Sequence, residues 1–259
     1  MRWSLARKRM YEACPRRYKY HYLESLYAFD KDRDFFSRRL YDRRHEKSLE
    51  EIFISVSQDF LPLVFCDARR SSKVNEVLDL SCSRELMGYP EGDREGLEFL
   101  LYPRFGRLIE SLLKLDEFSW LVPVKDVLLC NEFLKFETDE VEVDIFVSLA
   151  WRIKGELNIL RVQHHRLNVD EEAIALEALA FNKQFGQDLE EIVFWNLLIK
   201  DESCVILKSK LDLEKLFDVR EMIMQTRSLL NNTQNDFPFT ENMALCQKCK
   251  YLSLCERYE

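Results

Sequence analysis

The sequence predicts an α/β protein in which a mixed β-sheet is flanked by helices. Apolar residues recur at helical spacing over residues 4–24, 38–66 and 96–118. Runs rich in β-branched and other apolar residues, typical of strands, follow at 121–130, 141–150, 157–163, 190–199 and 203–208. A helical pattern at 170–185 separates the strands into two groups, and another at 212–230 follows them. This order favours a strand meander, a crossover helix and two further strands in one sheet.

Local signals support these boundaries in order along the chain. Six leucines at helical spacing give 96–118 one apolar face. Lys154-Gly155 marks the turn between two strands that we expect to pair as an antiparallel hairpin. Asp170-Glu-Glu opens the helix over 170–185 with the negative charge that a helix N-terminus favours. We expect a helical region over 1–118, an α/β core over 119–236 and a cysteine-bearing segment over 237–259, together forming one compact domain.

The composition excludes several classes of protein. Only 6 of the 259 residues are glycine, and the motifs GxGxxG, GxxxxGK[ST] and GxSxG are all absent. Dinucleotide, P-loop and nucleophile-elbow chemistry is therefore not expected. No apolar run approaches the roughly 20 residues of a membrane span. The N-terminus lacks an apolar signal core, so we expect a cytoplasmic protein, without membrane association, whose cysteines stay reduced.

The charge is unevenly distributed. The net charge is −8, but the first 50 residues carry +6 with interleaved aromatic residues. Such an arm suits a polyanion such as nucleic acid, and a helix with a solvated basic face is the alternative. The candidate contacts to nucleic acid are Arg16, Arg17, Lys19, Arg43 and Arg44.

Three cysteines near the C-terminus have the spacing of a metal site. Cys246 and Cys249 are separated by two residues, and Cys255 follows five residues later. Thiolates at this spacing select zinc, copper(I) or an iron–sulfur cluster, and a fourth ligand is needed. Cys14 lies in Cys-Pro-Arg-Arg-Tyr near the N-terminus. The other four cysteines suit small buried hydrophobic residues: Cys66, Cys82, Cys130 and Cys204.

Cys-Pro-Arg-Arg near the N-terminus, combined with C-x2-C-x5-C near the C-terminus, resembles the iron–sulfur branch of the PD-(D/E)XK (RecB-like) nucleases. This branch includes CRISPR-associated RecB-like exonucleases and the AddB subunits of bacterial helicase–nucleases. The resemblance implies a restriction-endonuclease-like core and a [4Fe–4S] cluster held by Cys14, Cys246, Cys249 and Cys255. Zinc on the same ligands and a redox-active CxxC are the alternatives.

The resembled family also has a nuclease centre that binds Mg²⁺ or Mn²⁺ through strand carboxylates. The resemblance places its histidine at His45 and its aspartate at Asp144, although a purely structural role is open for each. Where the family has an acid, any residue and then lysine, this chain has Arg161-Val162-Gln163. The helix over 170–185 also lacks a clear Q-x-x-x-Y motif. The motif is therefore degenerate, and we expect Arg161 to pair with Asp144 in place of a metal ion.

These observations favour an iron–sulfur protein of nuclease fold, more consistent with a pseudoenzyme than with an active nuclease. We expect it to bind DNA, single-stranded or containing an end, or to scaffold a complex for DNA processing, defence or repair with a protein partner. One alternative is an active Mg²⁺- or Mn²⁺-dependent DNA exonuclease with relocated ligands, for which Glu142 is a candidate. A second is a DNA-binding protein that senses redox state through its cluster.

Overall fold

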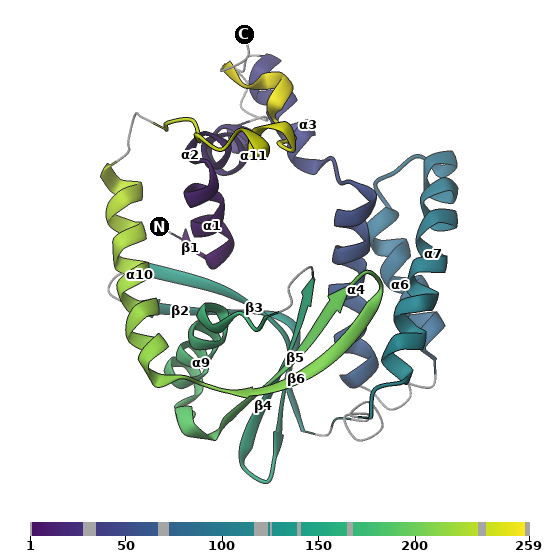
Figure 1. The fold of residues 1–259 in the computed structure, drawn as a ribbon, viewed down its shortest axis with the longest axis vertical. Coiled ribbons are helices and arrows are strands. Elements are labelled where there is room, and N and C mark those ends of the chain that lie inside the picture. Colours follow the sequence, from purple (N-terminus) through teal and green to yellow (C-terminus); the bar gives the residue numbers. More distant parts are fainter. Residues whose placement is uncertain are drawn as a thin grey trace. The chain divides into compact units, whose positions relative to one another are not determined.

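The computed structural model describes residues 2–27, 35–66, 73–116, 124, 126–138, 141–164, 168–232 and 237–256. The helices are α1 (Leu5–Ala13), α2 (Pro15–Tyr18), α3 (Phe35–His45), α4 (Leu49–Cys66), α6 (Val74–Leu86), α7 (Glu91–Leu113), α9 (Glu171–Phe185), α10 (Leu213–Asn232) and α11 (Met243–Gln247) (Figure 1). The strands are β1 (Arg2–Trp3), β2 (Val127–Thr138), β3 (Val141–Ile153), β4 (Glu156–His164), β5 (Ile192–Lys200) and β6 (Ser203–Lys210). Short π- or 3₁₀-helical turns cover Lys19–Leu23, Glu24–Tyr27, Leu189–Glu191 and Leu252–Leu254.

The described chain divides into two compact units. Unit 1 comprises residues 1–47, 137–143 and 220–259, and unit 2 comprises residues 48–136 and 144–219. Unit 1 therefore combines three segments that are far apart in the sequence. In unit 1, β1 pairs in parallel with the first residues of β3, where Arg2 lies opposite Glu142.

The sheet of unit 2 is mixed. β3 and β4 pair antiparallel, β4 and β5 pair in parallel, and β5 and β6 pair antiparallel. The turn between β3 and β4 consists of Lys154 and Gly155, both with positive φ (52° and 91°). A two-residue turn with positive φ at both positions matches the twist of an antiparallel hairpin, and glycine adopts this conformation without strain. The expected hairpin is confirmed.

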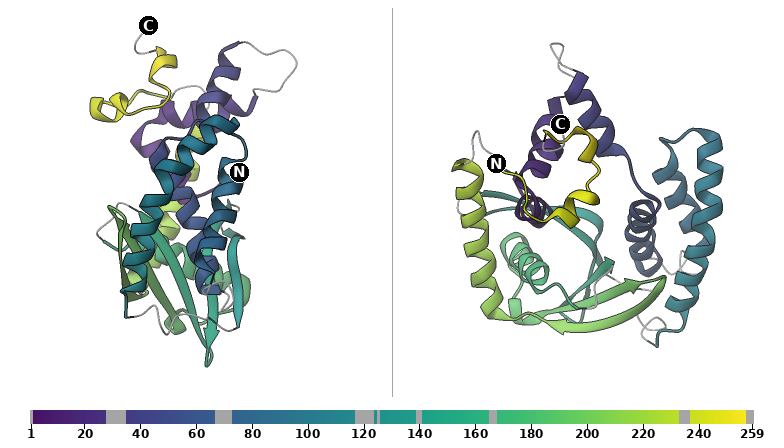
Figure 2. Two further views of the ribbon diagram at one scale, coloured as in Figure 1. Left: turned by 90° about the vertical axis from the view of Figure 1, so that its right-hand side faces the viewer. Right: turned by 45° about the horizontal axis from the view of Figure 1, so that its top comes forward.

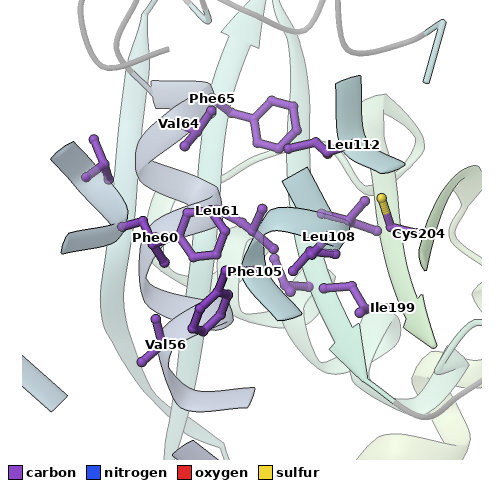
Figure 3. Close-up of a cluster of buried hydrophobic side chains, with 14 of the residues drawn as sticks. Val56, Phe60, Leu61, Val64, Phe65, Phe105, Leu108, Leu112, Ile199 and Cys204 are labelled. Carbon is purple, nitrogen blue, oxygen red and sulfur yellow. The ribbon is translucent and has the colours of Figure 1, made fainter. Parts of the chain in front are cut away.

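Strands β4 and β5 are buried along most of their length. On one face, side chains of α4 and α7 pack against β5 and β6, as Figure 3 shows. Helices α4, α6 and α7 lie beside one another in both views of Figure 2, and α4 contacts both other helices. Because strand side chains alternate between faces, Leu160 and Val162 join this core while Arg161 points to the opposite face, toward α9.

The fold class predicted from the sequence is confirmed: a mixed sheet is flanked by helices. The hairpin strands, α9, β5, β6 and α10 lie within three residues of the expected ranges. The expected helix over 4–24 is instead interrupted at Cys14, and that over 38–66 ends at His45 and restarts at Leu49. The strand expected at 121–130 begins at Val127, and 121–123 lie outside the described residues. Helix α6 was not predicted.

Within unit 1, the C-terminal segment lies beside the N-terminal helices, yellow against purple in Figures 1 and 2. A small core joins the two segments. Its buried members are Tyr20, Leu40, Tyr251 and Leu254, with Cys249 and Cys255 packed against them. Throughout the described chain, no helix has both the length and the apolar character needed to cross a membrane.

Candidate metal centre and nuclease-like site

Cys14, Cys246, Cys249 and Cys255 all line one pocket of unit 1. Cys14 ends α1 and begins α2, Cys246 lies in α11, and Cys249 and Cys255 flank the turn that contains Tyr251. The structure therefore brings together the four cysteines that the sequence selected. The remaining lining residues include two arginines and a mostly apolar or aromatic set: Ala13, Arg16, Arg17, Tyr20, Phe239, Thr240, Leu245, Tyr251 and Leu252.

Hydrogen bonds and ring contacts join the N-terminal and C-terminal segments that form this pocket. The backbone N–H of Arg16 donates to the carbonyl of Pro238 at 3.3 Å. The Lys250 ammonium donates to the carbonyl of Arg44 at 2.9 Å. Ring contacts between Tyr20 and Tyr251, with centroids 6.0 Å apart, add to these hydrogen bonds. The pocket is thus built by residues more than 200 positions apart in the sequence.

The surroundings of the cysteines are electropositive. Nδ1 of His21 lies 2.8 Å from the hydroxyl of Tyr251. Burial, followed by the charges of Arg44, Lys250 and Arg17, lowers the pKa of His21 to about 4. The backbone N–H of Arg17 donates to the Cys14 sulfur at 3.4 Å. Positive charge and N–H donors both stabilise thiolates and anionic groups bound to them.

Two arginines of the pocket have the chemistry to bind an anionic group. The Nε atoms of Arg16 and Arg17 are buried and have no hydrogen-bond partner among the described residues. Buried donors of this kind normally have a partner. Burial raises the pKa of the Cys249 thiol, so binding a metal there would release its proton.

The distances between donors limit which group can bind. In the described ranges, no three His, Cys, Asp or Glu side chains lie close enough together to hold one metal ion. The space between the pocket side chains is about 30 Å³. Binding a cluster therefore requires the side chains that line the pocket to move apart.

The other cysteines lie in apolar surroundings. Cys82 and Cys204 are buried in the unit 2 core, and Cys66 and Cys130 are partly buried against it. Burial raises the pKa of Cys82 to about 12, with smaller contributions from nearby carboxylates. Burial also raises the pKa of the Cys204 thiol, so Cys82 and Cys204 behave as small buried hydrophobic residues.

Arg161 forms a buried ion pair with Glu177. Its Nε donates to Glu177 Oε1 at 2.9 Å, and its NH1 donates to the carbonyl of Asp170 at 3.1 Å. The expected pair with Asp144 is therefore wrong, because the first turns of α9 supply the partners instead. Burial raises the pKa of Glu177 to about 7, against the opposing charge of Arg161.

Asp144 and Gln163 complete the description of this centre. The Gln163 amide donates to Asn196 Oδ1 at 3.3 Å, within the buried sheet. Asp144 is half-buried, and its Oδ1 is enclosed without a hydrogen-bond partner in the described part of the chain. The acid and lysine positions of the resembled motif thus hold side chains that bind other protein groups. Glu142 lies at the β1 pairing, in unit 1.

His45 is an exposed residue of unit 1. It ends α3, its ring lies over Tyr41 with centroids 4.1 Å apart, and its Nδ1 is 2.8 Å from the Tyr41 carbonyl. These contacts account for a structural role.

The candidate DNA-contacting residues are also in unit 1, and each has a protein contact. Lys19 pairs with Glu24, and Arg43 pairs with Glu46. Arg44 donates to the Ser25 hydroxyl at 3.2 Å. The guanidinium of Arg16 lies over the Phe239 ring and 3.5 Å from Glu256, whereas that of Arg17 contributes to the cysteine pocket.

Sequence reasoning missed Glu177, Asn196 and His21. The signal for Glu177 was its place among apolar residues of a helix that is otherwise buried, which calls for a partner of opposite charge. Asn196 gave a similar signal within the apolar run of β5.

Comparisons with known proteins give only distant matches. No family model matches the chain, and no curated protein matches its sequence. A crystal structure from Eubacterium rectale described as a "putative exonuclease" is 12% identical, with a TM-score of 0.43, and covers 94% of this chain and 90% of that one. The structure of the protein SSO0001 is 12% identical, with a TM-score of 0.33, over 86% of this chain and 94% of that one.

The Arg161–Glu177 pair gives the first prediction. Glu177→Ala lowers the free energy of unfolding by about 3–5 kcal/mol, because it leaves a buried guanidinium without its carboxylate. The double variant Arg161→Met/Glu177→Leu restores stability to within about 1 kcal/mol of the parent. Urea unfolding of all four proteins measures the coupling.

The matched control is an exposed ion pair in the same unit. Glu76→Ala breaks the pair between Lys73 and Glu76, and costs at most about 1 kcal/mol. Equal losses for Glu177→Ala and Glu76→Ala would contradict the buried pair.

Proposed function

We propose that this chain is an iron–sulfur protein of nuclease type whose catalytic metal site has been replaced by a protein ion pair. It binds DNA, single-stranded or containing an end, or scaffolds a DNA-processing complex. The observation that carries the proposal is the convergence of Cys14 with Cys246, Cys249 and Cys255 on one pocket. The four-thiol set resembles the ligand set of iron–sulfur RecB-like nucleases.

The chemistry of the donors supports a cluster. Four thiolates suit an iron–sulfur cluster or zinc. A zinc ion needs all four sulfurs at about 2.3 Å from one point, which is closer than these side chains lie. A cluster binds each cysteine through a different iron atom and so takes ligands that are farther apart. Arg16 and Arg17 would offset the negative charge of the bound group.

The role of such a group here is structural. It would link the N-terminal helices of unit 1 to its C-terminal segment, and its binding energy would contribute to folding. Arg16 and Arg17 would act at the cluster rather than on DNA, which leaves Lys19, Arg43 and Arg44 as the candidate phosphate contacts.

The buried ion pair supports loss of nuclease activity. Metal-dependent hydrolysis needs carboxylates that hold Mg²⁺ or Mn²⁺. Arg161 brings positive charge to the position where the resembled family has an acid, and α9 holds it there. A divalent ion at this position would lack a carboxylate ligand and meet a cation.

An active nuclease remains the second candidate, because of Asp144. A buried carboxylate oxygen without a hydrogen-bond partner is a position where a cation is favourable. The two candidates differ in whether Mg²⁺ or Mn²⁺ supports DNA cleavage.

A bound cluster predicts that replacing a cysteine of the pocket abolishes cluster binding, whereas replacing a cysteine outside it does not. After anaerobic reconstitution, the parent protein contains iron and acid-labile sulfide in equal amounts and absorbs visible light. Cys14→Ser loses most of this absorption and melts at a lower temperature, since one ligand and the link between segments are lost. Cys66→Ser, outside the pocket, keeps both. Zinc alone, or full cluster content in Cys14→Ser, would refute the proposal.

DNA binding is predicted to depend on the basic residues of α3. Arg43→Gln weakens binding of single-stranded DNA and reduces the slope of log K against log salt by about 0.7, because one phosphate contact is lost. Lys73→Gln is the control. It breaks the Lys73–Glu76 pair, which is also exposed and also joins residues three positions apart, and it leaves the slope unchanged. Fluorescence anisotropy at several salt concentrations measures both. An unchanged slope in Arg43→Gln would contradict this contact.

The nuclease centre is predicted to be inactive. Purified protein incubated for hours with Mg²⁺ or Mn²⁺ leaves single-stranded DNA and duplex ends intact, as gel electrophoresis would show. The reason is that Arg161 occupies the position of the acid in the resembled motif. Cleavage that Asp144→Asn abolishes would show instead that the second candidate is right.

A further inference from the structure

Unit 2 has a polar pocket that the proposed function does not use. Its volume is about 420 Å³, within the usual range for sites that bind small molecules. It lies among α4, α6, β2 and β3, and the lining residues are Ser55, Val56, Gln58, Asp59, Ser81, Arg84, Glu85, Asn131 and Phe146. We propose that this pocket binds an organic cation of the guanidinium or primary-ammonium class.

Asn131 presents an acceptor to the pocket. Its Nδ2 donates to the Asp59 carbonyl at 2.7 Å and lies 3.4 Å from Asp59 Oδ1. Both partners are acceptors, so the amide nitrogen has to face them and the amide oxygen points elsewhere. That oxygen is buried without a hydrogen-bond partner among the described residues. Asn131 has a φ of 54° within β2, a left-handed conformation that asparagine tolerates better than most residues.

Ser81 provides a second unpartnered group. The residue is 1% exposed, and its hydroxyl has no hydrogen-bond partner in the described part of the chain. A serine buried in a helix usually donates to the carbonyl four residues earlier, as Ser57 does to Phe53 at 2.7 Å in α4. Ser81 lacks this bond and lines the pocket instead. A ligand that donates hydrogen bonds would satisfy both Ser81 and Asn131.

The charge and the aromatic ring of the pocket select a cation. The lining residues include two carboxylates, of Asp59 and Glu85, and one guanidinium, so the negative charges outnumber the positive one. That guanidinium, of Arg84, already lies 2.7 Å from Asp59 Oδ2. An anionic ligand such as a phosphate would meet net negative charge. Phe146 is 39% exposed and offers a ring to a cation, which is favourable within about 6 Å of the ring centre. Guanidinium and ammonium groups donate hydrogen bonds without accepting any, which matches the lining.

The test uses the full chain and two probes. Agmatine carries a guanidinium and an ammonium group as a free small molecule, and a short peptide with one central arginine presents the same group on a protein. Calorimetric titration is expected to show saturable binding of at least one probe at a single site. Tenfold tighter binding of the peptide assigns the cation to a protein partner, and equal or tighter binding of agmatine assigns it to a small molecule.

Ser81→Ala is the decisive variant. It removes a hydroxyl without a partner, so the melting temperature stays the same or rises, while binding weakens about tenfold through loss of a hydrogen bond to a charged group. Ser57→Ala removes a buried hydroxyl outside the pocket and leaves binding unchanged. No saturable binding of either probe, equal binding by Ser81→Ala, or preferred binding of inorganic phosphate would each overturn the proposal. The result is independent of the cluster and of DNA binding.

Discussion

Burial of the central strands constrains the rest of unit 2. Strands β4 and β5 pair in parallel and are covered along most of both faces, so every polar side chain on them needs a partner inside the protein. Arg161 binds Glu177, Gln163 binds Asn196, and the Trp195 indole donates to Asn158 at 2.9 Å. Arg161 and its partners at the start of α9 are therefore part of the core of unit 2.

The cysteine pocket of unit 1 is held together by contacts between segments that are distant in the sequence. Its aromatic core and its hydrogen bonds between segments already bring the four thiols together. A bound group would then add to protein contacts that already join the two segments. Arg17, Arg44 and Lys250 surround His21 there, and this positive charge suits an anionic bound group.

Most of the fold could be predicted from the sequence, and the candidate sites only in part. The hairpin and α9 carried strong local signals: the turn at Lys154-Gly155, and the cap at Asp170, whose carboxylate accepts from the Ala173 N–H. Helix α6 was missed because its apolar residues are interspersed with charged ones. The cysteine set could be selected because its spacing is unusual. The partner of Arg161 could not be predicted from the sequence. Asp144 and Glu177 are both carboxylates, and only the packing of α9 on the sheet decides which of them pairs with Arg161.

Unit 1 has a consequence for how the protein is made. Its pocket combines Cys14 with Cys246, Cys249 and Cys255, which are synthesised more than 230 residues later. The intervening chain includes all of unit 2, which is therefore available to fold first. Until the C-terminal segment is made, Tyr18 lacks its ring contact with Phe237, and Tyr20 lacks its ring contact with Tyr251. The time for which Cys14 waits for the other three cysteines is therefore set by the translation rate over the intervening residues, and not by the stability of the finished fold.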